Sequence, residues 1–151
     1  MTFDESNHAR FVEAWLNKAT QRQPPTALIS VFKRGTSALW QRALVTLGEV
    51  TLTAIVDRVL YTATEKYPFL STLKVDETGI RFDEFRREGA VQHDGLLVDA
   101  TLFVMAEFLS VIGRLTDEIL TPALHAELSK VVLDEPDAVG RAAKKVTGAR
   151  T

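Results

Sequence analysis

The 151-residue chain contains no cysteine. Disulfide bonds, thiolate zinc sites, iron–sulfur clusters and cysteine nucleophiles are therefore excluded. A charge excess of either sign is also missing, because 18 Lys and Arg residues nearly balance 20 Asp and Glu residues and leave a net charge of −2. Nucleic-acid-binding domains of this size usually carry a basic excess, so the balance argues against a nucleic-acid partner.

The common catalytic and nucleotide-binding motifs are absent as well. The chain has no Gly-x-Ser-x-Gly nucleophile elbow, no Gly-x-x-x-x-Gly-Lys-Ser/Thr phosphate loop and no Gly-x-Gly-x-x-Gly dinucleotide fingerprint. The three histidines, His8, His93 and His125, do not share the i, i+4 spacing of a helical metal pair. We therefore expect no cofactor and no metal site, and the absence of these motifs favours a protein that is not an enzyme.

Length and composition are those of one ordinary globular domain, with 46% hydrophobic and 25% charged residues. Residues 1–8 lack the basic and apolar regions of a secretory signal. We expect a cytoplasmic protein.

The most informative segment is the apolar stretch over residues 96–120, which predicts a helix of about seven turns. Its polar residues fall within one stripe about 100° wide, and the rest of its circumference is apolar or small. Such a helix has to be wrapped by other elements or by a second copy of the chain. Ionisable residues at membrane depth cost about 2.5–3.5 kcal/mol each, so we expect no membrane span. The stripe consists of Asp99, Glu107, Ser110, Arg114, Asp117 and Glu118.

The pattern of apolar residues predicts four further helices, over residues 4–21, 26–33, 36–66 and 121–132. Pro24 and Pro68 end two of these runs. Gly35 is expected to be a C-terminal cap or a break, and Gly48 a kink or a close helix crossing.

Over residues 72–82 the apolar period changes from about four to two, which predicts a β-hairpin with a four-residue loop at 76–79. The predicted fold is mainly α, with about five helices and this one small hairpin. Residues 1–132 are expected to form a single helical domain. The apolar pattern thins afterwards, so residues 133–151 are expected to form a mobile C-terminal tail.

His125 is the first candidate site residue, as a phosphoacceptor. Leu124, Leu128 and Val131 are expected to face the core and to turn His125 toward partial exposure. A phosphoacceptor histidine needs an exposed imidazole with one ring nitrogen free. The neighbouring residues do not match the His-x-x-Lys-Gly pattern of histidine phosphotransfer, and an ordinary surface histidine explains the same pattern.

Asp99, Glu107 and Arg114 are the second candidates, for binding a ligand. Carboxylates held in a pocket between helices can perform acid–base chemistry when burial separates their pKa values. The alternative is a stripe that faces solvent or another subunit.

These patterns favour a non-catalytic regulatory or signalling interaction module that binds a protein partner or a small ligand through its helices. Two alternatives stay open: a histidine phosphotransfer protein that uses His125, and a ligand sensor or enzyme with an inter-helix pocket near Glu107 and Arg114. Because two long helices carry more apolar surface than the remaining elements are expected to cover, we also predict a homodimer.

Overall fold

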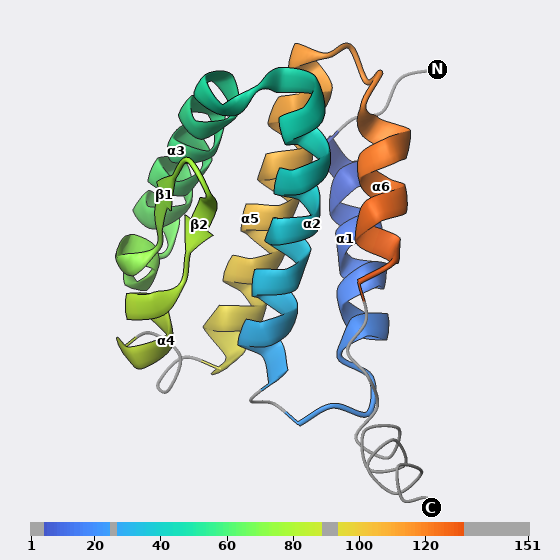
Figure 1. Cartoon of the computed structure of the whole chain (residues 1–151). Helices are drawn as coiled ribbons and strands as arrows, with labels where there is room; N and C mark the ends of the chain where they lie inside the picture. Colours follow the sequence, from blue (N-terminus) through green and yellow to red (C-terminus); the bar gives the residue numbers. More distant parts are fainter. Residues whose placement is uncertain (1–4, 25–26, 89–93, 132–151) are drawn as a thin grey trace, which may run out of the picture.

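The computed structural model describes residues 5–24, 27–88 and 94–131 (Figure 1). Within these ranges the chain forms six α-helices, a short 3₁₀ helix and one two-stranded antiparallel hairpin, which confirms the predicted fold class. The predicted C-terminal tail lies outside the described residues. The elements are α1 (Glu5–Ala19), α2 (Leu28–Leu47), α3 (Glu49–Lys66), η2 (Pro68–Thr72), β1 (Lys74–Asp76), β2 (Gly79–Arg81), α4 (Asp83–Glu88), α5 (Asp94–Leu115) and α6 (Thr121–Ser129).

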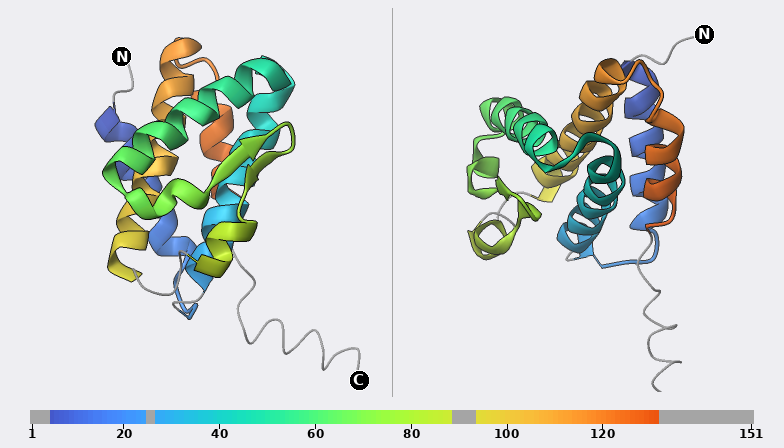
Figure 2. Two further views of the ribbon diagram at one scale, coloured as in Figure 1. Left: turned by 90° about the vertical axis from the view of Figure 1, so that its left-hand side faces the viewer. Right: turned by 45° about the horizontal axis from the view of Figure 1, so that its top comes forward.

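Helix α5 is the centre of the fold. Figure 2 shows it between α3 and the hairpin on one side and α1 and α6 on the other, and α2 packs against it as well. The same chain therefore supplies the wrapping that the apolar circumference of α5 requires. The homodimer stays a prediction, but a second copy of the chain is not needed to bury the apolar surface of α5. The buried apolar residues of α5 include Ala100, Val104, Met105, Phe108, Leu109 and Ile112.

Among the described residues, one helix is long and apolar enough to cross a membrane. It spans Gly95–Leu115, with a mean hydropathy of 1.9 over its most apolar window, and half of that window is buried inside the protein. The core helix of a globular protein has the same length and composition.

Gly35 does not end a helix, contrary to the prediction. Helix α2 runs through Gly35, and the chain breaks at Gly48, whose φ of +83° is readily adopted by glycine. Gly35 instead allows close packing: a Cβ atom at this position would lie 2.7 Å from Trp15 Cη2 and 2.8 Å from Met105 Cε. The missing side chain therefore makes room for the Trp15 ring between α1, α2 and α5.

Helix α5 ends at Leu115, short of the predicted end. Asp117 and Glu118 have φ values of 53° and 64°, and the Glu118 amide donates to the Gly113 carbonyl at 2.7 Å. This is the 6→1 bond of a Schellman motif, here with aspartate at the position that glycine usually occupies. The prediction that Asp117 and Glu118 share the α5 stripe is therefore wrong.

The predicted hairpin is confirmed, with a tighter turn than expected. Asp76 pairs with Gly79, which leaves a two-residue turn. The Thr78 amide and hydroxyl donate to Asp76 Oδ1 at 2.8 and 2.6 Å, and these bonds hold the pKa of Asp76 below its usual value. The hairpin packs on α2 and α3.

We predict that Gly35→Ala lowers the free energy of unfolding by about 1–2 kcal/mol. The added methyl group overlaps Trp15 and Met105, and this strain exceeds the gain in helix propensity. The matched control is Gly95→Ala, because a Cβ atom there meets nothing within 4 Å. Chemical denaturation measures both changes. Equal stability of the two variants would contradict the packing role of Gly35.

Candidate functional site

The polar residues of α5 do not converge on one site. Asp99 and Arg114 are exposed, Glu107 is half-buried and Ser110 is buried. The pockets between α1, α2 and α5, between α2 and the hairpin, and between α3 and β1 are lined by other residues. An inter-helix pocket near Glu107 and Arg114 stays a prediction, without support from these cavities.

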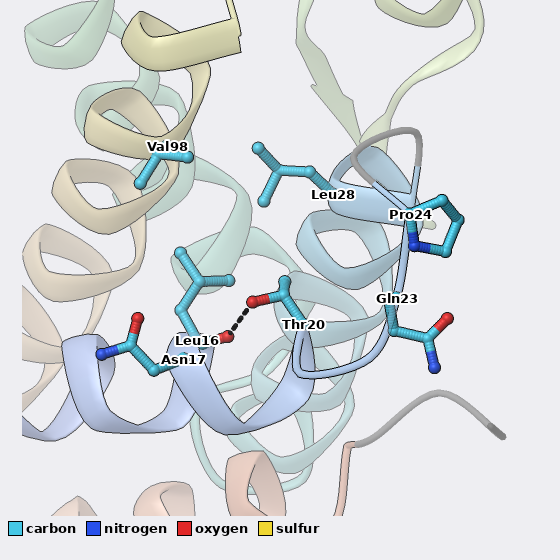
Figure 3. A pocket seen from close by; sticks show the side chains of 7 residues that line it. All are labelled: Leu16, Asn17, Thr20, Gln23, Pro24, Leu28 and Val98. Atoms are coloured by element: carbon cyan, nitrogen blue, oxygen red, sulfur yellow. Dashed lines mark hydrogen bonds between the residues drawn. The ribbon is translucent and has the colours of Figure 1, made fainter.

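A pocket of about 290 Å³ lies where α1 ends, α2 begins and α5 passes beside them (Figure 3). Leu16, Leu28 and Val98 point toward the same space, one from each helix. Between α1 and α2 the chain turns sharply, with a φ of 63° at Arg22. The lining residues are Leu16, Asn17, Thr20, Gln23, Pro24, Leu28 and Val98.

The lining of this pocket carries no Asp, Glu, Lys, Arg or His side chain. The Thr20 hydroxyl donates to the Leu16 carbonyl at 2.7 Å inside its own helix. The amide groups of Asn17 and Gln23 lie at the edges of the pocket. Its chemistry is therefore that of an apolar cavity with a few neutral polar groups, as is common for small-molecule sites.

Two further pockets flank the hairpin, with volumes of about 200 and 340 Å³. The smaller one contains Lys33 and Arg81, the residue types that would bind an anion. However, Arg81 donates to Asp76 at 3.1 Å and to Asp83 at 2.8 Å, so its charge is already compensated. We therefore assign no function to either of these two pockets.

The structure brings together two of the three histidines. His8 Nδ1 on α1 lies 3.3 Å from His125 Nε2 on α6, although the residues are 117 positions apart. His8 Nε2 lies 3.4 Å from Glu118 Oε1, and this oxygen accepts the Thr121 hydroxyl at 2.5 Å. We call these four residues, together with Phe11, the histidine cluster.

Burial and charge make His125 hard to protonate. His125 is half-buried, and the Phe11 ring stacks on its imidazole with centroids 3.9 Å apart and planes inclined by 8°. Burial, and then the positive charge of His8, lower the pKa of His125 from its usual 6.5 to about 4, although Glu118 acts in the opposite direction. His125 is therefore a neutral ring at neutral pH.

The surroundings of His125 do not favour phosphoryl transfer. The predicted burial of Leu124 and Leu128 is confirmed, and His125 has the expected partial exposure. Its Nε2, however, faces His8, and one face of its ring is covered by Phe11. The phosphotransfer hypothesis stays untested, without support from this geometry.

Metal binding is equally unsupported. In residues 5–24, 27–88 and 94–131, no group of three or more His, Cys, Asp or Glu side chains is arranged to hold a metal ion. His93 lies outside the described residues.

No family model matches the chain, and no curated protein or solved structure is detectably similar to it. The functional argument rests on the residues themselves.

Sequence reasoning named His125 but missed its contact with His8, and it missed the pocket, both for physical reasons. No local pattern predicts that His8 meets His125, because only the packing of α1 against α6 joins them. The pocket left one weak signal, the prolines after α1, which predicted a break but not a cavity.

We predict that Thr121→Val lowers the free energy of unfolding by about 1–2 kcal/mol, because Glu118 loses a hydrogen-bond donor in a part-buried site. Thr20→Val is the matched control. The Leu16 carbonyl that accepts the Thr20 hydroxyl also accepts the Thr20 amide, so this acceptor stays satisfied. Thermal or chemical denaturation at pH 7 compares the variants. A cost for Thr121→Val no larger than that for Thr20→Val would contradict the role of the hydroxyl.

Proposed function

We propose that the protein is a non-catalytic regulatory module that binds a small uncharged ligand in the pocket between α1, α2 and α5. The observation that carries this proposal is the lining: three apolar side chains from three helices, neutral polar groups at the edges and no ionisable side chain. An apolar pocket with few polar groups favours binding over catalysis, since acid–base and nucleophilic chemistry needs groups of the kind that this lining lacks.

The size and chemistry of the pocket define the class of ligand. A volume of about 290 Å³ is near the lower end of small-molecule sites and fits on the order of a dozen non-hydrogen atoms. An ion would lose its hydration without a counter-charge in the lining, so charged ligands are disfavoured. We expect a compact apolar molecule with one neutral polar group that bonds to Asn17. Its dissociation constant is expected on the order of 10–100 μM.

Binding is tested with three probes of one shape and different charge: benzamide, benzoate and benzylammonium. We expect benzamide to shift the amide resonances of Leu16, Leu28 and Val98, and the two ions to bind at least tenfold more weakly. Titrations followed by ¹H–¹⁵N correlation spectra measure this. Failure of benzamide to bind at 10 mM, or binding of an ion as tight as that of benzamide, would overturn the proposal.

We further predict that Val98→Trp weakens benzamide binding at least tenfold. Val98 is 39% exposed, so an indole ring can fill the pocket from its mouth without entering the core. Tyr61→Trp is the control, because Tyr61 is 62% exposed and lies on α3, which does not line this pocket. Unchanged affinity in Val98→Trp, with the variant folded, would place the binding elsewhere.

The predicted homodimer now rests on one end of the molecule. The α2–α3 corner and the α5–α6 turn lie at the same end (Figure 1), and both carry exposed apolar side chains. We expect a dimer in sedimentation equilibrium at about 100 μM, and a shift toward monomer when Val50 and Ile119 are both replaced by glutamate. A monomer in the unmodified protein would end the dimer hypothesis. The exposed residues are Val45, Val50, Leu115 and Ile119.

A further inference from the structure

We propose that the histidine cluster is an acid-operated latch that holds the first turns of α1 against α6, tolerates one proton on the His8–His125 pair and opens on the second. It does not depend on the ligand pocket, which lies toward the other end of α1.

The latch is built from contacts between three parts of the chain. Glu118 Oε1, in the turn after α5, lies 3.4 Å from His8 Nε2, an ion-pair distance, and we therefore assign the His8 proton to Nε2 and the acceptor role to Nδ1. His8 Nδ1 then receives the N–H of His125 Nε2 across 3.3 Å. The Thr121 hydroxyl holds the carboxylate in place. His8 is 1% exposed, so this chain lies inside the seam between α1 and α6.

A single added proton is compatible with this chain. When His8 carries this proton, its Nε2–H faces the Glu118 carboxylate and its Nδ1–H points at His125 Nε2. His125 Nε2 accepts that hydrogen bond when the proton of the neutral His125 ring is on His125 Nδ1 instead. A second proton leaves N–H groups facing each other at 3.3 Å and puts two positive charges on adjacent rings. The contact that joined the helices then becomes repulsive.

Burial of His125, and then the charges around it, fix the direction of the response. The described groups that act on His125 are His8 from α1, which disfavours its protonation, and Glu118 from the α5–α6 turn, which favours it. The charged residues that neighbour the cluster along the chain, Arg10 on α1, Arg114 at the end of α5, Asp117 in the turn and Lys130 after α6, are exposed, and the half-buried Glu127 on α6 pairs with Lys130 at 3.3 Å. Their influence is weakened by solvent.

The pH range follows from the difference between the closed and open states. In the closed state the pKa of His125 is about 4, whereas an exposed imidazole has the ordinary value of about 6.5. The open state therefore binds more protons between these values, and closure is fully favoured above pH 6.5. It weakens as the pH falls toward 4, by at most about tenfold per pH unit for one proton.

The opening is expected to be local. Trp15, two turns after His8, donates from Nε1 to the Val131 carbonyl at 3.1 Å, and its ring fills the gap at Gly35. Neither contact involves a group that titrates between pH 4 and 7. The second half of α1 therefore stays docked while its first turns separate from α6.

Hydrogen exchange of the full chain tests the latch. We expect the protection factors of the residue 9–12 amides, corrected for intrinsic exchange, to fall at least tenfold between pH 6.5 and 4.5. The amides of residues 105–112 in α5 are expected to change less than threefold. Loss of protection in α5 in parallel with α1 would mean global acid unfolding and would overturn the proposal, as would constant protection in α1.

His125→Gln supplies the variant, because glutamine keeps a polar side chain but takes up no proton. It leaves the pair with at most the one proton that the closed state tolerates, so we expect the pH dependence in α1 to fall to less than threefold. Arg10→Gln is the matched control, because Arg10 is exposed on the same helix, and it is expected to behave like the unmodified protein. If His125→Gln does not fold, the hydrogen exchange of the unmodified protein decides alone. An unchanged pH response in a folded His125→Gln would refute the latch.

Discussion

The burial of α5 is the constraint on which the rest of the structure depends. This helix presents large apolar side chains around most of its circumference, and each fully buried one contributes about 1.5–3 kcal/mol. Four helices and the elements around the hairpin have to lie along it. Gly35 shows how tight the wrapping is, because the Trp15 ring reaches between α1, α2 and α5 only where a side chain is missing.

A bundle built around one helix places its polar and irregular features at the helix ends. The backbone turns there, and side chains of different elements meet without continuous packing. At one end, the Schellman turn after α5 directs Glu118 back toward α1, where it faces His8. At the other end, the turn between α1 and α2 leaves the pocket. Both candidate sites therefore follow from how the helices that wrap α5 begin and end.

Helix α1 contributes residues to both sites. Its first turns carry His8 and Phe11, its last turns carry Leu16 and Asn17, and Trp15 anchors it between them. A proton would act on one end of this helix and a ligand on the other. Because the anchor contacts α2, α5 and the end of α6, the two events need not be coupled, and each has its own experimental readout.

The sequence by itself determined the fold class, the hairpin and the central helix, because apolar periodicity and turn residues are local signals. It also predicted correctly which side of α6 faces the core, and hence the partial exposure of His125. The structural roles of two glycines were predicted less well. A glycine that ends a helix and one that admits a neighbouring ring look alike in sequence, so Gly35 and Gly48 exchanged the roles expected of them.

Only the tertiary structure decided what the helices do to one another. The contact of His8 with His125, the carboxylate of Glu118 beside them and the pocket lined from three helices all join residues far apart in the chain. Burial and a neighbouring charge lower the pKa of His125, and neither effect can be predicted from the residues next to His125 in the sequence. Periodicity determines which face of a helix is buried, whereas the elements that meet there depend on the packing of the whole chain.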